Sequence, residues 1–117
     1  MIVPPAGVRV LIATKPVDFR AGMDRLAAIA KETLAEDPFS GTVLVFRARR
    51  ADRVKILAWD GTDLVLVSKR LEQAAFKWPP ITDGLMRLSP AQFATLVEGL
   101  DWRRVHVPEV TRPTATQ

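Results

Sequence analysis

Short runs of β-branched and aliphatic residues, separated by turn residues, recur along much of the chain and predict several β-strands. The predicted main strands cover 7–14, 42–47, 54–59, 64–71 and 85–88. A further span, 76–78, precedes Pro79 and Pro80 and is predicted to be a short edge strand, since proline cannot donate to a sheet ladder.

Two segments instead carry apolar residues at helical spacing. The first is predicted to be a helix from about Arg20 to Ala35, entered through a turn at 15–19 with Asp18 as a plausible N-cap. Asp37-Pro38 is expected to stop this helix, because the residue before proline resists the helical region.

The second predicted helix begins at Ser89-Pro90, in the favoured order of a capping serine followed by proline at the first helical position. It is expected to end near Gly99. Its predicted buried face consists of Phe93, Leu96, Val97 and Leu100.

Asp60-Gly61 is a strong hairpin signal and predicts a two-residue type I′ turn with these residues at its centre. Such a turn fixes the pairing of the flanking strands. The predicted register sets Trp59 opposite Thr62, Leu57 opposite Leu64, Lys55 opposite Leu66 and Arg53 opposite Ser68.

The order of strand, helix, strand meander and helix predicts a small single-domain α+β protein, not a doubly wound α/β one. We expect an antiparallel β-meander of about 4–6 strands covered on one face by two helices. Residues 1–104 are predicted to form the globular domain. Residues 105–117 are polar and proline-containing, and are predicted to be a disordered tail.

Composition removes several classes of enzyme. The 117 residues include no cysteine, which excludes disulfides, thiolate metal sites and a cysteine nucleophile, and no tyrosine, which excludes a phosphotyrosyl recombinase. One histidine, His106, cannot supply a multi-histidine metal site. The aspartates are explained locally as cap and turn residues. We therefore expect no enzymatic activity, no catalytic residue, no cofactor and no metal.

Charge is concentrated in one place. The formal net charge is +4, and the segment 47–55 alone carries five basic residues and one acidic residue. A protruding two-stranded ribbon can enter a DNA groove, and arginine suits phosphate oxygens. Lys69 and Arg70 follow on a neighbouring predicted strand and extend the patch. The candidate nucleic-acid-binding residues are Arg47, Arg49, Arg50, Arg53, Lys55, Lys69 and Arg70.

A second interpretation of segment 47–55 is a solvated turn that keeps a hairpin in solution, and both interpretations stay open. The tryptophans could stack on bases, although core packing is the better prediction for Trp59 and Trp102. Trp78 precedes two prolines and is expected to be partly exposed.

Seven ordered motifs between Ile2 and Arg104 resemble a known family. They are the segments Gly7–Thr14, Pro16–Arg20, Asp37–Gly41, Val45–Arg53, Lys55–Gly61, Lys69–Glu72 and Glu98–Arg103. Together they closely resemble the TnpB accessory protein of insertion-sequence-66 (IS 66) type bacterial mobile elements. This protein is distinct from the RNA-guided nuclease that shares the name TnpB.

The resemblance implies a cytoplasmic bacterial accessory protein for transposition, encoded beside a separate transposase that carries the catalytic acids. DNA and that transposase are the implied partners, with no membrane contact. An alternative is an adaptor that binds the transposase without touching DNA. Many members have glycines where this chain has Ala48 and Ala51, so a stiffer loop is expected, in the form of a short helical turn.

Overall fold

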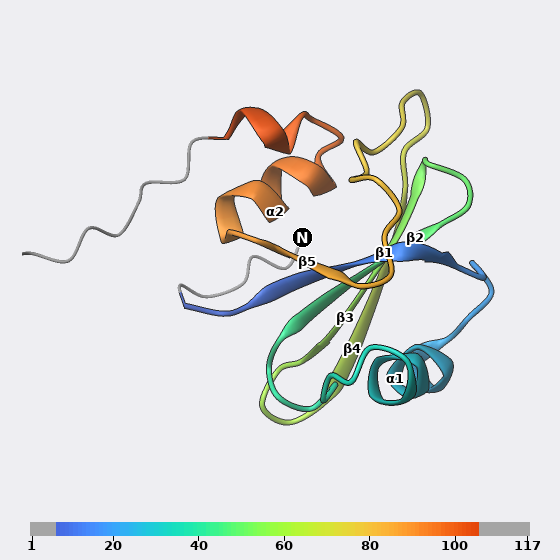
Figure 1. Ribbon diagram of the computed structural model, residues 1–117, viewed down its shortest axis with the longest axis vertical. Coiled ribbons are helices and arrows are strands. Elements are labelled where there is room, and N and C mark those ends of the chain that lie inside the picture. Colours follow the sequence, from blue (N-terminus) through green and yellow to red (C-terminus); the bar gives the residue numbers. More distant parts are fainter. Residues whose placement is uncertain (1–6, 106–117) are drawn as a thin grey trace, which may run out of the picture.

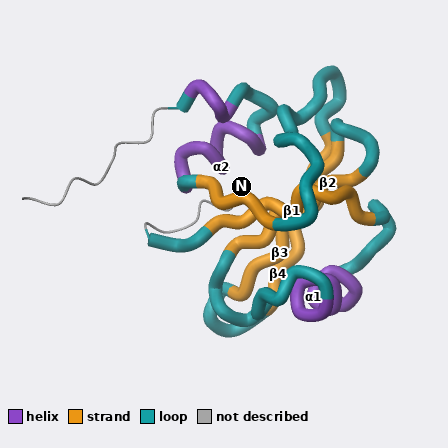
Figure 2. The backbone as a smooth tube through the Cα atoms, in the orientation of Figure 1, coloured by secondary structure: helices purple, strands orange, loops and turns teal. Residues whose placement is uncertain are grey.

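The computed structural model describes residues 7–105, so the predicted tail lies outside the described residues from His106 onward (Figure 1). The loop of residues 71–84 that joins β4 to β5 has no helix or strand (Figure 2). The elements in chain order are β1 (Val10–Val17), α1 (Met23–Glu32), β2 (Val43–Ala48), β3 (Arg53–Trp59), β4 (Leu64–Arg70), β5 (Leu85–Leu88), α2 (Pro90–Val97) and the short 3₁₀ helix η1 (Trp102–Arg104).

The five strands form one sheet in the order β4-β3-β2-β1-β5, which confirms the predicted small α+β class. The expectation of a wholly antiparallel sheet is wrong for one pair, because β1 and β2 run parallel. The connection between them contains α1, and parallel neighbours need such a crossover. The other three pairs are antiparallel.

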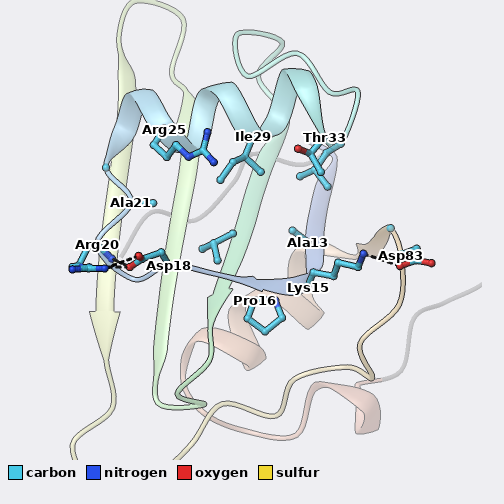
Figure 3. A pocket seen from close by; sticks show the side chains of 14 residues that line it. Ala13, Lys15, Pro16, Asp18, Arg20, Ala21, Arg25, Ile29, Thr33 and Asp83 are labelled. Carbon is cyan, nitrogen blue, oxygen red and sulfur yellow. Dashed lines mark hydrogen bonds and ion pairs between the residues drawn. The ribbon is translucent and has the colours of Figure 1, made fainter.

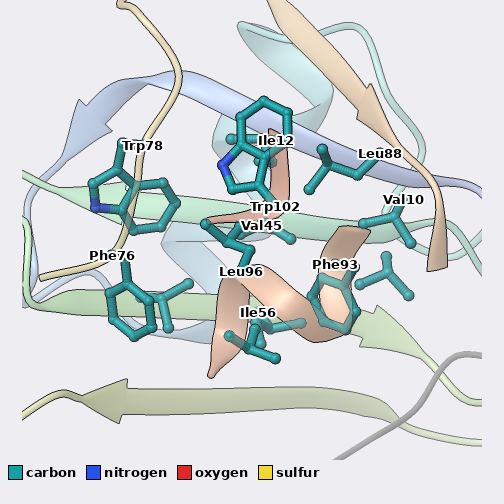
Figure 4. Close-up of a cluster of buried hydrophobic side chains, with 13 residues drawn as sticks. Val10, Ile12, Val45, Ile56, Phe76, Trp78, Leu88, Phe93, Leu96 and Trp102 are labelled. Carbon is teal, nitrogen blue, oxygen red and sulfur yellow. The ribbon is translucent and has the colours of Figure 1, made fainter. Parts of the chain in front are cut away.

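Apolar side chains pack on both faces of the sheet. Alternate residues of a strand point to opposite faces, so the fully apolar runs in β1 and β2 supply both sides. The cluster against α2 includes Val10, Ile12, Val45, Ile56, Phe93 and Leu96 (Figure 4). The cluster against α1 includes Leu11, Leu44, Phe46, Leu57, Leu26 and Ala30. The prediction that both helices cover one face is therefore wrong.

The start of α1 differs from its prediction. β1 continues through Pro16 to Val17, with an irregular register against β2 between Ala13 and Val17, so the turn expected at 15–19 begins later. The carboxylate of Asp18 does not cap the helix: its Oδ1 accepts from the backbone N–H of Arg20 at 2.9 Å. Gly22 is the N-cap and has no side-chain cap.

The end of α1 also precedes the predicted stop at Asp37-Pro38. The helix ends at Glu32, with Thr33 as its C-cap. Ala35 follows with a φ of 53°, in the left-handed region that turns the chain away from the helix axis.

The β3–β4 turn is centred one residue later than predicted. Asp60 donates its N–H to the Asp63 carbonyl at 3.0 Å, and its own Oδ1 accepts the N–H groups of Asp63 at 2.7 Å and Thr62 at 2.9 Å. These bonds hold Asp60 at the first corner, with Gly61 (φ 105°) and Thr62 at the centre. Trp59 therefore lies opposite Leu64, not Thr62. Because the shift is two residues, every side chain keeps its predicted face.

The predicted start of α2 is confirmed. Ser89 Oγ accepts from the N–H of Gln92 at 3.1 Å, and Gln92 Oε1 accepts from the N–H of Ser89 at 2.9 Å, which is a capping box. The helix ends at Val97, and Gly99 has a φ of 79°. Leu100 is therefore turned away from the buried face and is 61% exposed, contrary to prediction.

The core prediction for Trp102 is confirmed, because this side chain is only 9% exposed. Trp59 is half-buried and packs edge-on against Phe39, with ring centroids 5.5 Å apart. Within residues 7–105, neither helix is both long and apolar enough to cross a membrane.

Replacing Ser89 by alanine should lower the free energy of unfolding by about 1 kcal/mol, because the substitution removes one half of the capping box. Urea unfolding would measure the decrease. Ser68→Ala on the exposed side of β4 is the matched control and should change the free energy by less than about 0.5 kcal/mol. Equal decreases in both variants would contradict a specific role for the cap.

The Asp60 turn should also make stability depend on pH. The N–H groups of Asp63 and Thr62 hold the pKa of the Asp60 carboxyl below its usual value of 3.8. The carboxylate therefore contributes stability above pH 3.8, and this contribution disappears as the pH falls through the lowered pKa. Asp60→Asn keeps an acceptor oxygen but does not titrate. Its unfolding midpoint should fall less than that of the parent between pH 5 and pH 2, as followed by circular dichroism. Parallel curves would exclude this contribution.

Candidate nucleic-acid interface

The basic hairpin, residues 47–55, lies at the end of the sheet where β1, β2 and β4 finish (Figure 1). Ala48 pairs with Val17, and Arg53 pairs with Arg70. The loop is closed by a bond from the N–H of Arg53 to the Arg50 carbonyl at 3.3 Å. The loop thus makes one tight turn, and neither Ala48 nor Ala51 has a positive φ.

Arg49 and Arg50 are the two exposed cations at the tip of the basic hairpin. Among the described residues, Arg49 has no hydrogen-bond or ion-pair partner. Arg50 lies 3.6 Å from the Asp52 carboxylate, and its side chain is 72% exposed. A surface pair of this length is weak. Both guanidinium groups are therefore available to an anionic ligand.

Arg47 faces α2 and is held by its neighbours. Its guanidinium stacks 5.4 Å from the ring centroid of Trp78, and its Nη1 donates to the Pro79 carbonyl at 3.3 Å. Burial lowers the pKa of Arg47, and its Nε has no hydrogen-bond partner within the described residues. Arg47 thus packs against the 78–79 segment, although the sequence predicts it as a phosphate ligand.

Arg53 and Lys55 face the opposite side of the sheet and gather around Phe19. The Arg53 guanidinium carbon lies 4.9 Å and the Lys55 Nζ lies 4.7 Å from the centroid of that ring. Lys55 also donates to the Ala21 carbonyl at 2.7 Å. The side chain of Arg53 is only 14% exposed and lies 3.8 Å from Asp52. These two cations join the hairpin to the chain that leads into α1.

Lys69 and Arg70, the predicted extension of the patch, point to opposite faces of β4. Lys69 donates to the Val97 carbonyl at 2.6 Å, at the carboxyl end of α2, where a cation is favourable. Arg70 pairs with Glu72 at 3.1 Å. Arg70 lies opposite Arg53 of the basic hairpin, whereas Lys69 is directed toward α2.

Trp78 anchors the loop, contrary to the expectation that it is partly exposed. It is 8% exposed, and its Nε1 donates to the Ala51 carbonyl at 3.1 Å. The N–H of Phe76 donates to the same carbonyl at 2.9 Å. The span 76–78 is irregular instead of a strand, and it crosses the sheet end to make these contacts. The tip of the basic hairpin is thereby fixed before any ligand binds.

Two adjoining depressions lie beside the hairpin, and the larger contains cations that sequence reasoning missed. The smaller, of about 400 Å³, is lined by Phe19, Arg49, Arg50 and Arg53. The larger, of about 820 Å³, lies between β1 and α1 and contains Lys15, Arg20 and Arg25 (Figure 3). Pro16, Val17 and Asp18 border both.

Two of these additional cations are already paired. Arg20 holds the pKa of the Asp18 carboxyl below its usual value through a side-chain hydrogen bond, and Lys15 does the same to Asp83 across 2.8 Å. Arg25 has no ion-pair partner among the described residues. The larger depression could have been predicted only from the motif Pro16–Arg20, which is one of the seven motifs of the resemblance. This motif contains no run of basic residues, so its charge does not mark it as a binding site.

The chain matches known proteins over nearly its whole length. A family model described as IS66 Orf2 like protein matches residues 8–107. The uncharacterized protein y4jC of Sinorhizobium fredii (strain NBRC 101917 / NGR234) is 47% identical over 114 residues, which cover 97% of this chain and 97% of the relative. The uncharacterized protein y4hO of the same strain is 41% identical over 112 residues, which cover 94% and 96% respectively. No solved structure matches the chain.

Trp78→Phe should loosen the basic hairpin without emptying the core, because it removes the indole donor to Ala51 and keeps an aromatic ring. One hydrogen bond is worth about 1 kcal/mol, so amide hydrogen exchange at Arg53 and Phe76 should rise about fivefold. Trp59→Phe at the other end of β3 is the control and should leave these amides unchanged. Unaltered exchange in Trp78→Phe would show that the indole does not hold the loop.

Proposed function

Because the chain belongs to the family of IS66 Orf2 like proteins, we propose that it is a non-catalytic accessory protein for the transposition of a bacterial insertion sequence, and that it contacts DNA through the basic hairpin. The resemblance expected from the seven sequence motifs is confirmed by the family match. Family membership implies the accessory role in transposition. The proposed contact with DNA rests on the basic hairpin.

The pair Arg49-Arg50 carries the proposal. Both side chains are exposed in the turn that joins β2 to β3 at the end of the five-stranded sheet, and the turn beneath them is fixed by the bonds at Ala51. Donors that are already ordered lose little conformational entropy on binding, and a guanidinium presents several donors to phosphate oxygens.

The neighbouring groove supports an extended contact. Arg25 lies on the α1 side of the larger depression, and Arg50 lines the smaller one. Between them, Asp18 is already paired with Arg20, which reduces the repulsion that a bare carboxylate would exert on a phosphate. The proposed path for the DNA backbone therefore runs from the hairpin tip toward α1.

The second candidate function is an adaptor that binds the transposase of the same element without touching DNA. The larger depression favours it, since its lining includes the apolar side chains of Val17, Ile29 and Leu34 beside its charged rim. Apolar floors with a few polar groups are typical of binding sites for other molecules. Under either function the protein would act with the transposition machinery in the cytoplasm.

The double substitution Arg49→Ala/Arg50→Ala should weaken binding of the full chain to a duplex that carries the terminal repeat of the element. Fluorescence anisotropy against salt concentration measures this. For every phosphate that the protein no longer neutralises, the slope of log affinity against log salt should become shallower by about 0.9. Arg87→Ala/Arg104→Ala removes the same charge from exposed positions elsewhere and should leave the slope nearly unchanged.

A shuffled duplex tests whether binding depends on sequence. Equal slopes for the parent chain and Arg49→Ala/Arg50→Ala would exclude the basic hairpin as the contact. Absence of binding at low salt, together with nuclease-resistant capture of the transposase, would favour the adaptor.

A further inference from the structure

We propose that the outer edge of β4 pairs with the same edge of a second copy of the chain. β4 is the last strand of the sheet in the order β4-β3-β2-β1-β5, and among residues 7–105 only β3 pairs with it (Figure 1). Seven residues, Leu64–Arg70, therefore have one side of the backbone without a sheet partner in this part of the chain.

The backbone bonds to β3 identify the free groups. The N–H of Leu71 donates to the Asp52 carbonyl at 2.8 Å, and the N–H of Asp60 donates to the Asp63 carbonyl at 3.0 Å. The register between these two contacts is continuous, so residues 63, 65, 67, 69 and 71 direct their backbone groups toward β3. The N–H and C=O groups of Leu64, Leu66, Ser68 and Arg70 consequently point outward.

Over residues 64–68 this edge lacks the usual protection against pairing, and the charged residues of β4, Lys69 and Arg70, lie only at its end. Natural edge strands are blunted by proline, bulges, short length or charged side chains. The first four residues of β4 are Leu64, Val65, Leu66 and Val67, all half-buried, and their ladder with β3 has no irregularity. The opposite edge of the sheet is protected, because β5 has only four residues and carries the exposed Arg87.

The sequence of β4 is complementary to itself. Two antiparallel copies related by a twofold axis perpendicular to the sheet must keep each face continuous, so residues of the same parity lie opposite each other. With Leu66 on the axis, it faces its own copy, Val65 faces Val67, and Leu64 faces Ser68. Asp63 then lies opposite Lys69 on the α2 side, once in each half of the interface.

These pairs favour a second copy over an unrelated strand. Opposed apolar and opposite-charge pairs each add stability across an antiparallel ladder. Here the same residues supply both partners, and the resulting sheet would be continuous through ten strands, from five in each copy. The competing occupant of this edge is a β-strand of another protein. In that case the purified chain would be monomeric.

Sedimentation equilibrium of the full chain tests the proposal. The expected mass is twice the 13.0 kDa of one chain, with dissociation on dilution. Ser68→Pro should shift the equilibrium to the single chain, since proline removes an N–H that points outward and is tolerated at such edge positions. Ser68→Ala keeps that N–H and should stay dimeric. A parent chain that is monomeric up to submillimolar concentration would overturn the proposal.

Cross-linking keeps the test decisive if Ser68→Pro does not fold. The chain has no cysteine, so Leu66→Cys introduces a single thiol on the proposed axis. Opposed residues in an antiparallel ladder have Cα atoms about 5.5 Å apart, within disulfide range. Mild oxidation should convert this variant to a covalent dimer, whereas Arg87→Cys on β5 should stay largely uncrosslinked. Equal yields from both variants would contradict the register.

Discussion

Burial of the sheet on both faces is the constraint that determines where charge can lie in this protein. In residues 10–13 of β1 and 43–46 of β2 every position is apolar, because alternate residues pack under one helix and the residues between them pack under the other. Charged side chains therefore lie outside these two runs. The cations of the basic hairpin begin directly after the apolar run of β2, because a cation within that run would carry a large desolvation cost.

The same constraint divides the cations by role. Those nearest the core, such as Arg47 and Lys69, use their long stems to reach a backbone carbonyl at Pro79 or Val97. Their hydrophobic stems cover apolar surface while the charged group finds an acceptor. Within the basic hairpin, only Arg49 and Arg50, beyond the last buried residue of β2, extend freely into solvent. A charge count over 47–55 cannot separate these two roles, since both give the same sequence pattern.

Local signals allowed reliable prediction where the physics is local. Ser89-Pro90 fixes the start of α2, and apolar runs bounded by turn residues identify the main strands within a few residues. Prediction failed where the conformation depends on a residue that is distant in the sequence. Trp78 is buried because Ala51 offers it a carbonyl, and the parallel pairing of β1 with β2 depends on a crossover that no short pattern encodes. At the candidate site, the hairpin was predictable, whereas the groove beside α1 requires the fold to bring Arg25 near Pro16.

The place of β1 in the sheet also has a consequence for biosynthesis. β1 is the first strand of the sheet to leave the ribosome, yet one of its two neighbours, β5, is the last strand of the sheet to be made. Until Leu88 and α2 emerge, β1 presents an open edge, and the cluster around Ile12 and Val45 has no helical cover. Since chains are made at about 5–20 residues per second, the sheet is completed only seconds after β1 appears. The sheet therefore cannot be completed until β5 has been synthesised, and a chain that stopped short of β5 would expose two apolar edges in place of one.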